Sequence, residues 1–264
     1  MSCSDPSRQE GANADRARVM FAHRKNLVIP EIFWPLTSSR VLIMEFIHGA
    51  KVTDLGYLNK HKIDPRLVAT TFNDLFGEMI YTRGFVHADP HPGNVYVRSK
   101  EPTRSWWNWL FGGKSSNFEL VLFDHGLYRE LSDDFRLNYA HLWLSIINGT
   151  QRRVFFMYWL TSDAGDEKGI KHYSKELGAG DLYRLFTAML TARVYDSVVS
   201  TDGSNNNLKK PRSEAETKLM MNTASNYLTD VNTIFGSIPR ELLLVLKTND
   251  LARSVENTLL VRCV

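Results

Sequence analysis

The residues best suited to chemistry lie in two short segments, about thirty residues apart. Residues 87–94 read His-Ala-Asp-Pro-His-Pro-Gly-Asn, and residues 124–126 read Asp-His-Gly. Phosphoryl transfer from ATP uses one carboxylate to accept the substrate proton, and carboxylate or amide oxygens to bind magnesium. Asp89, Asn94 and Asp124 supply these groups in that order, so the two segments together indicate a phosphoryl-transfer site.

One helix and two short strands are predicted to position these residues. Asp64 followed by Pro65 is typical of a helix start. Strands are predicted at residues 95–97 and 120–123, with residues 99–117 as an insertion between them. Because a strand–turn–strand returns the chain to its starting edge, we expect Asp124 to lie beside Asp89 and Asn94. Apolar residues recur at helical spacing between Pro65 and Gly84: Val68, Phe72, Leu75, Phe76 and Met79.

The segment before residue 64 is predicted to hold a small β-structure. Residues 1–13 carry little that could be buried, and we expect the beginning of this stretch to be frayed, with a short helix over residues 14–24. The apolar runs at residues 27–32 and 41–47 predict a β-hairpin. The second run, Val-Leu-Ile-Met-Glu-Phe-Ile, barely alternates, and we expect it to be buried on both faces.

From residue 132 onward the pattern is helical. Ser132 and the two acids after it predict a helix start, because acids favour the positive N-terminal end of a helix. Further helices are predicted over residues 153–161, 181–199, 213–235, 239–246 and 251–260, with a solvated linker at residues 200–212. A few strands followed by a mainly helical body predict an α+β fold class.

Composition argues against several classes of protein. A net charge of +3 over 264 residues is too small to indicate a nucleic-acid partner. Cys3 and Cys263 lie near opposite ends and indicate neither a disulfide framework nor a cysteine zinc site. No apolar run reaches the length of about eighteen residues that a spanning helix needs, and residues 1–15 lack the pattern of a secretory or transit signal.

The two catalytic segments carry a resemblance to a known family. Together with Leu-Ile-Met-Glu-Phe-Ile-His-Gly at residues 42–49, they resemble the UbiB or aarF-domain atypical kinases, including the mitochondrial members. The similarity spans residues 9–260. It implies a protein-kinase-like α+β fold in which residues 1–46 are the remnant of a truncated small N-terminal lobe, and residues 47–264 form a mainly α-helical C-terminal lobe.

The resemblance implies a role for each residue of the catalytic segments. Asp89 would be the catalytic carboxylate, and Asn94 and Asp124 would bind Mg²⁺. The cofactors implied are therefore ATP and Mg²⁺, and the activity implied is ATP hydrolysis or phosphoryl transfer to an unknown acceptor. His125 stands where many kinases have Phe, so the usual packing at that position is not expected.

The resemblance also assigns the nucleotide pocket. Met44 would border the adenine, the backbone of Glu45 and Phe46 would bind it, and Glu10 would pair with a phosphate-binding lysine. Residues 1–9 contain no lysine, and the family's phosphate-covering loop is missing. We therefore expect weak ATP binding and poor catalysis from this chain. The alternative is a catalytically impaired pseudokinase that binds a partner or a lipid.

Two further interpretations stay open. His87, Asp89 and His91 could bind a metal in a hydrolase, although Pro90 and Pro92 make the required helix implausible. Backbone-bonding roles for both histidines are expected instead.

The aromatic residues of the insertion are compatible with a membrane surface. Trp106, Trp107 and Trp109 are flanked by basic residues, so they could enter a membrane interface or pack onto the protein. The family resemblance implies a mitochondrial setting, linked to lipid and coenzyme Q homeostasis.

Overall fold

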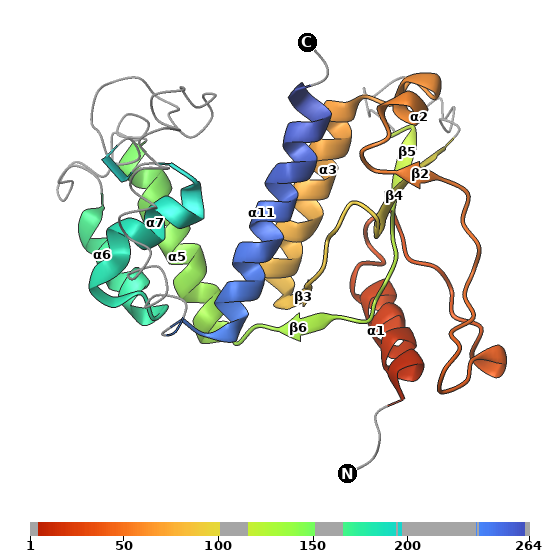
Figure 1. The fold of residues 1–264 in the computed structure, drawn as a ribbon, viewed down its shortest axis with the longest axis horizontal. Helices are drawn as coiled ribbons and strands as arrows, with labels where there is room; N and C mark the ends of the chain where they lie inside the picture. Colours follow the sequence, from red (N-terminus) through yellow and green to blue (C-terminus); the bar gives the residue numbers. More distant parts are fainter. Residues whose placement is uncertain are drawn as a thin grey trace. The chain divides into compact units, whose positions relative to one another are not determined.

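The computed structural model describes residues 5–100, 116–150, 166–193, 195–196, 236 and 238–261 (Figure 1). These residues form two compact units, one made of residues 1–130 with 247–264 and the other of residues 131–246. Helices and a small mixed sheet make up the fold, as the predicted α+β class requires. The lobe boundary expected at residue 46 stays a prediction.

A four-stranded sheet forms part of the first unit, in the order β1-β5-β4-β2. It consists of β1 (Leu27–Val28), β2 (Ala50–Lys51), β4 (Val95–Ser99) and β5 (Phe118–Leu122). β4 pairs antiparallel with β5 and with β2, whereas β1 runs parallel to β5. The two strands predicted after residue 94 are confirmed, and all five residues of β5 are buried.

A second, two-stranded sheet was not predicted. β3 (Phe85–His87) pairs antiparallel with β6 (Tyr128–Glu130), and His87 lies opposite Tyr128. Beyond the ladder, the Ala88 N–H donates to the Leu127 carbonyl oxygen at 2.9 Å. β3 leads into the loop that carries Asp89 and Asn94, and β6 follows the loop that carries Asp124, so this sheet holds one end of each loop together.

The helix before these loops follows the prediction. α2 (Leu55–Lys60) is followed by α3 (Pro65–Gly77), which continues through a π-helical turn, η2 (Glu78–Arg83). Asp64 caps α3 by accepting the Arg66 N–H at 2.9 Å. Gly84 ends the segment with φ +62°, a left-handed conformation that glycine adopts without steric cost. The predicted apolar stripe is buried: Val68, Phe72, Leu75, Phe76 and Met79.

The helix predicted over residues 14–24 begins and ends earlier than expected, because α1 covers Pro6–Met20. The beginning of the chain that was expected to be frayed, residues 1–4, lies outside the described residues. The buried face of α1 is made of Gly11, Ala14 and Ala17, and such small residues give almost no periodic hydrophobic signal. A Cβ on Gly11 would lie 2.8 Å from a ring carbon of Trp34, so this face is small because an aromatic ring packs on it.

The predicted hairpin is present only in part. Ile32 and Met44 form an antiparallel bridge, flanked by hydrogen bonds from the Phe33 N–H to the Ile43 carbonyl oxygen and from the Glu45 N–H to the Glu31 carbonyl oxygen, both 2.8 Å. A 3-10 turn, η1 (Trp34–Leu36), precedes the return. Burial of residues 41–47 on both faces was wrong, because the Phe46 side chain is 81% exposed.

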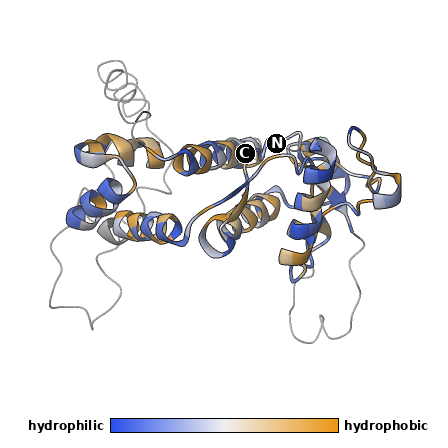
Figure 2. Ribbon diagram, turned by 90° about the horizontal axis from the view of Figure 1, so that it is seen from below, coloured by the Kyte–Doolittle hydropathy of each residue, from blue (hydrophilic) through white to orange (hydrophobic). Residues whose placement is uncertain are grey.

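The second unit is helical within its described residues. It contains α5 (Asp133–Thr150), α6 (Glu167–Glu176), a 3-10 turn η3 (Gly180–Leu182) and α7 (Tyr183–Thr191). α6 packs against both α5 and α7, and the helices carry distinct apolar and polar sides (Figure 2). The start at Ser132 is confirmed by the Phe135 N–H, which donates to the Ser132 hydroxyl oxygen at 3.2 Å. Sequence patterns missed α6.

The last helix differs from the prediction. Residues 239–246 and 251–260 were expected to form two helices, but a single helix, α11 (Arg240–Val261), runs through both. Asn249 and Asp250 have low helix propensity, yet the helix runs through them, and Thr248 and Val255 on either side are buried.

Several expectations lie outside the described residues. These are the helices over residues 153–161 and 213–235, the linker at residues 200–212, and Trp106, Trp107 and Trp109 of the insertion. Among the helices that the structure does describe, none is long and apolar enough to cross a bilayer.

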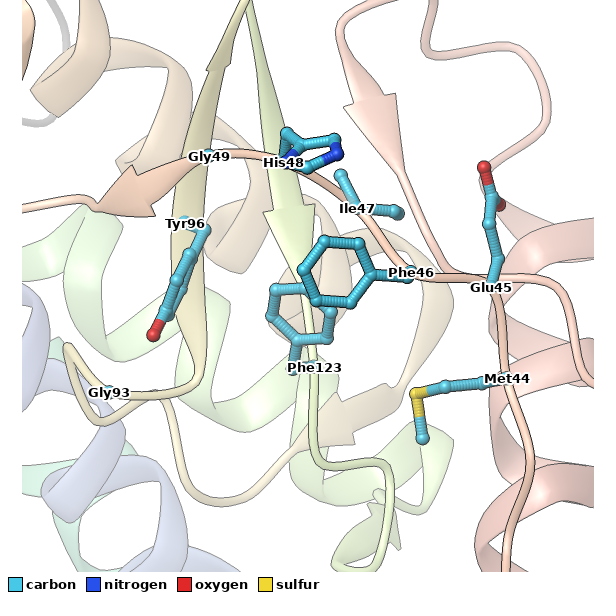
Figure 3. A pocket seen from close by; sticks show the side chains of 9 residues that line it. All are labelled: Met44, Glu45, Phe46, Ile47, His48, Gly49, Gly93, Tyr96 and Phe123. Carbon is cyan, nitrogen blue, oxygen red and sulfur yellow. The ribbon is translucent and has the colours of Figure 1, made fainter.

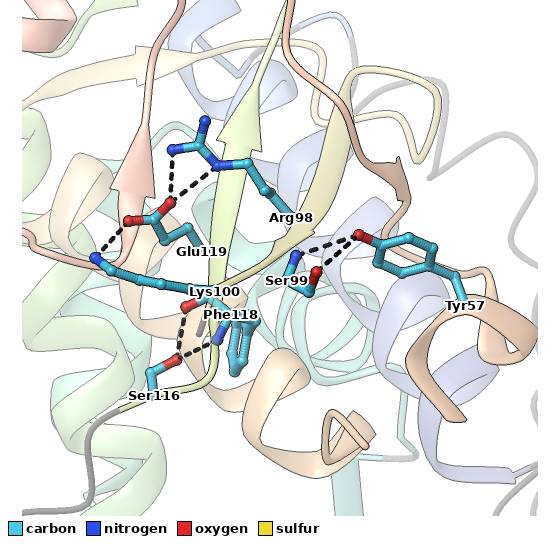
Figure 4. Close-up of polar contacts among 7 residues, drawn as sticks. All are labelled: Tyr57, Arg98, Ser99, Lys100, Ser116, Phe118 and Glu119. Atoms are coloured by element: carbon cyan, nitrogen blue, oxygen red, sulfur yellow. Dashed lines mark hydrogen bonds and ion pairs between the residues drawn. The ribbon is translucent and has the colours of Figure 1, made fainter. Parts of the chain in front are cut away.

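A buried carboxylate joins β4 to β5 near the insertion (Figure 4). Glu119 accepts two hydrogen bonds from Arg98, at 3.0 and 2.7 Å, and one from Lys100 at 2.8 Å. Burial alone would raise the pKa of the Glu119 carboxyl, but the bonds from Lys100 and Arg98 outweigh it and hold that pKa below its usual value. Beside this group, the Tyr57 hydroxyl contacts the N–H and the side chain of Ser99, which attaches α2 to β4.

We predict that Glu119→Gln destabilises the protein by about 1–3 kcal/mol at pH 7, because it removes charge-assisted hydrogen bonds from a buried position. A lowered pKa in the folded state means that the stabilisation is complete above about pH 4.5 and is lost as the pH falls through the folded pKa. Thermal unfolding across pH 3–7 should therefore show the largest difference between the two proteins at neutral pH.

Glu130→Gln is the matched control, because Glu130 pairs with Arg16 at the surface, where both side chains are about half exposed or more. Exposed pairs contribute about 0–1 kcal/mol. Equal destabilisation by the two variants, or a Glu119 effect that does not shrink in acid, would contradict the assignment.

Candidate functional site

The loop between β3 and β4 carries Asp89 and Asn94 and is folded onto its own backbone. The Asp89 N–H donates to His87 Nδ1 at 3.2 Å, and the Asn94 side-chain amide donates to the Asp89 carbonyl oxygen at 3.1 Å. The Asn94 N–H reaches the His91 carbonyl oxygen at 2.8 Å, and His91 Nδ1 accepts the Gly93 N–H at 3.0 Å. These bonds fix the loop without regular secondary structure.

The loop after β5 brings Asp124 to the same place. The Phe123 N–H donates to the Asn94 carbonyl oxygen at 2.8 Å, and Asn94 Nδ2 lies 3.4 Å from Asp124 Oδ2. Asp124 has φ +55°, a left-handed conformation that is uncommon for residues with a side chain. Its Oδ1 accepts the Gly126 N–H at 3.3 Å, which supports the turn. Asp89, Asn94 and Asp124 are thus brought together, as the sequence predicted.

Two buried histidines hold these loops in place. His87 Nδ1 accepts a backbone N–H, so Nε2 carries the proton and donates to the Phe123 carbonyl oxygen at 3.2 Å. His125 Nε2 likewise donates to the Leu122 carbonyl oxygen at 3.0 Å, which leaves Nδ1 to accept the Tyr128 hydroxyl at 3.0 Å. Both imidazoles therefore act as neutral links to backbone carbonyl groups.

Burial keeps both rings uncharged. It lowers the pKa of His87, and burial together with the nearby His87 ring lowers the pKa of His125 to about 4. The Tyr128 hydroxyl has a raised pKa for the same reason, so it stays a hydrogen-bond donor.

The histidine contacts do not support a metal hydrolase. Both nitrogens of His87 are used by backbone groups, and His91 Nδ1 is used by Gly93. Within the described part of the chain, no group of three or more His, Cys, Asp or Glu side chains is arranged to bind a metal ion. The backbone-bonding roles expected for both histidines are confirmed.

Glu10 reaches this site from α1. On the same helix, Asn13 Nδ2 donates to the His125 carbonyl oxygen at 2.9 Å, which fastens α1 to the loop. The pKa of Glu10 is raised, first by burial and then by the negative charge of Asp124, against a hydrogen bond from the His125 backbone. The glutamate expected to face a lysine therefore lies close to a second carboxylate.

A cavity of about 460 Å³ lies beside the polar cluster (Figure 3). Met44, Glu45 and Phe46 form one wall, and Phe123 and Tyr96 lie across from them. The Tyr96 and Phe123 rings meet edge to face with centroids 5.2 Å apart. The volume falls within the range of about 300–1,000 Å³ that is typical of small-molecule sites.

The cavity is continuous in the chain with the polar residues. Its lining includes Gly93 and Phe123, which directly precede Asn94 and Asp124. An apolar compartment thus adjoins a cluster of oxygen donors, an arrangement that suits a ligand with an aromatic ring at one end and negative charge at the other.

The sequence identified one wall of the cavity and missed the other. Tyr96 lies between the buried residues Val95 and Val97, so strand alternation alone would have placed its side chain on the opposite face. The backbone of Glu45 was expected to bind the adenine, but its N–H already donates to the Glu31 carbonyl oxygen.

Comparison with known proteins agrees with this geometry. The ABC1 atypical kinase-like domain matches residues 7–158. The AarF domain-containing protein kinase 1 of Mus musculus is 42% identical over 250 residues, which are 95% of this chain and 41% of the relative. AarF domain-containing kinase 1 of Drosophila melanogaster is 39% identical over 252 residues, 95% of this chain and 42% of the relative.

A more distant relative shows the same coverage pattern. The probable serine/threonine-protein kinase abkB of Dictyostelium discoideum is 32% identical over 246 residues, 93% of this chain and 30% of the relative. The chain thus spans about two fifths or less of the curated relatives described here. The match over more than half of its residues shows that the chain belongs to the UbiB or aarF (ABC1) family of atypical kinase-like proteins.

Proposed function

We propose that this site binds ATP with Mg²⁺ and serves ATP hydrolysis or phosphoryl transfer. The observation that carries the proposal is the meeting of Asn94 and Asp124, from separate loops, at the edge of an apolar cavity. Asp89 belongs to the same hydrogen-bonded cluster through its carbonyl oxygen.

The donor set fits magnesium, which prefers carboxylate, amide and phosphate oxygens. Asn94 and Asp124 would bind the ion. Burial, and then the nearby charge of Asp124, raise the pKa of Glu10, and a divalent cation would relieve the repulsion between these two carboxylates. When bound, Mg²⁺ would offset the negative charge of the phosphate oxygens. Asn94 and Asp124 would orient it, and their backbone hydrogen bonds keep both side chains fixed.

The cavity fits the nucleoside end. Met44 and Phe46 would contact the base from one side, and Phe123 and Tyr96 from the other. Because the Glu45 N–H is bonded to Glu31, base recognition would use the Glu45 carbonyl oxygen and the backbone of Phe46. Glu10 would lie at the phosphate end, near Asp124.

Asp89 would accept the proton of the attacking hydroxyl or water. Its side chain is 37% exposed, so an acceptor can reach the carboxylate from solvent. The hydrogen bonds of its backbone to His87 and Asn94 hold the residue in place, and this role needs such positioning.

The family resemblance supports a mitochondrial setting linked to lipid or coenzyme Q homeostasis. A small molecule, a lipid or a protein is then an equally suitable phosphate acceptor. Contact of Trp106, Trp107 and Trp109 with a membrane surface belongs to the same proposal.

A pseudokinase scaffold is the second candidate. It is favoured by the position of Glu10 beside the Asp124 carboxylate, where the family resemblance implies a lysine partner. In that case the large helical part would bind a partner or lipid, and the oxygen donors would not support turnover. Nucleotide binding distinguishes the two candidates.

We expect ATP with Mg²⁺ to raise the melting temperature, and Asp124→Asn to abolish that rise. Ligand at about one hundred times its Kd adds about 2.7 kcal/mol of stability, which corresponds to roughly 5–10 °C for a chain of this size. Thermal unfolding with and without Mg²⁺ measures the effect.

Asp133→Asn serves as the control, because this exposed aspartate lies in the second unit and pairs only locally with Arg136. It should respond to ATP as the unmodified protein does. No rise in any of the proteins would instead favour the scaffold.

Phe46→Ala should weaken ATP binding by about 2–12-fold, because the ring lines the cavity and aromatic contacts contribute about 0.5–1.5 kcal/mol. Its high exposure predicts no loss of stability. Titration with a fluorescent ATP analogue, displaced by ATP, gives the affinities. Leu36→Ala is the control. Leu36 is another exposed apolar side chain, but it does not line the cavity, so this variant should leave both affinities unchanged.

A further inference from the structure

The Asp89 carboxylate has a cationic partner from a distant part of the chain. Lys247 Nζ donates to Asp89 Oδ1 at 2.9 Å, across 158 positions of sequence. Lys247 lies on α11, and residues 247–264 belong to the same compact unit as residues 1–130. The contact is therefore internal to the unit that carries the whole candidate site.

The catalytic loops themselves provide no positive charge. Residues 88–94 and 123–127 contain neither lysine nor arginine. Among the ion pairs and hydrogen bonds that Asp89, Asn94 and Asp124 make with other described residues, the cationic partner is Lys247. A site for transfer of a phosphoryl group needs such a charge, because negative charge spreads over the phosphoryl oxygens in the transition state.

The ion pair between Lys247 and Asp89 contributes little to the stability of the fold. The Lys247 and Asp89 side chains are 52% and 37% exposed, and ion pairs with that much solvent contribute little to stability. The helix is held by other residues, since Thr248, Val255 and Leu259 are buried. Substitution of Lys247 should thus leave the fold intact.

The geometry also leaves the ammonium available to a ligand. An ammonium group has three N–H donors, and Asp89 accepts from one. With its side chain half exposed, the group can donate to a phosphate oxygen that lies next to Asp89.

We propose that Lys247 belongs to the site, where its ammonium positions the Asp89 carboxylate and binds the phosphoryl group that is transferred. The inference rests on the proposed function, since Asp89 is the proton acceptor there. It assigns to the C-terminal helix a charge that the loops lack. It also explains why an exposed lysine and an exposed aspartate from distant segments lie in contact.

The test compares Lys247→Met and Lys247→Arg with the unmodified chain, and uses Lys51→Met, an exposed lysine on β2, as the control. Two quantities are measured: the rate of phosphate release at saturating ATP with Mg²⁺, and the affinity for inorganic tripolyphosphate with Mg²⁺. The second has no base and reports on the phosphate end alone. Thermal unfolding confirms that each variant is folded.

We expect Lys247→Met to lower the saturated rate by about 10–100-fold and to weaken tripolyphosphate binding, with the melting temperature unchanged. The ATP concentration for half-maximal rate should change less than the rate. Lys247→Arg keeps the charge and should retain most of both properties, and Lys51→Met should retain all. Unchanged rate and tripolyphosphate affinity in Lys247→Met, or equal losses in Lys247→Arg and Lys247→Met, would overturn the proposal.

The outcomes separate this inference from the proposed function. If Asp124→Asn abolishes ATP binding while Lys247→Met behaves as the unmodified protein, the proposed function stands and the role of Lys247 fails. If ATP neither binds nor turns over, the proposed function fails. Tripolyphosphate binding then tests the role of Lys247 without ATP. Binding that depends on the charge at residue 247 supports an anion site at Lys247, whereas absent or charge-independent binding overturns it.

Discussion

The backbone of Phe123 is the point on which the rest of the site depends. Its N–H donates to the Asn94 carbonyl oxygen, and its carbonyl oxygen accepts from His87, so both backbone polar groups of this residue are bonded to the segment from His87 to Asn94. The Phe123 ring lines the cavity, and the next residue, Asp124, turns away with a positive φ. Asp124, Asn94 and the apolar cavity can lie together because this one residue is bonded on both sides.

Neutral groups support the charged ones. His87, His125 and Tyr128 are buried, keep fixed tautomers or protons, and bond to backbone carbonyl oxygens or to one another. If these rings were charged, they would compensate the carboxylates internally; because burial keeps them neutral, the negative charge of Asp124 remains to act on Glu10. The neutral side chains that hold the loops therefore do not offset the negative charge of Asp124.

The sequence predictions succeeded for elements that depend on interactions between residues close in sequence, and failed where distant segments pack together. The start of α3 at Asp64, its apolar stripe, and β4 and β5 depend on capping, local periodicity and strand propensity, and the structure confirms all of them. The first part of α1 was missed because the buried residues Gly11, Ala14 and Ala17 are small and show no apolar period, and Gly11 lies against the Trp34 ring. Phe46 was expected to be buried because its run of residues barely alternates, but it is exposed, since burial of a strand face depends on partners that local sequence does not specify.

At the site, the sequence by itself determined Asp89, Asn94 and Asp124 as a group, because a helix, a tight loop and a strand pair place them by short-range geometry. Membership in the family also followed from these local motifs. Only the tertiary structure decided that Lys247 meets Asp89, that Glu10 lies near Asp124, and that Tyr96 and Phe123 complete the cavity. These contacts depend on packing between segments that are distant in the chain, and no local propensity or spacing encodes such packing.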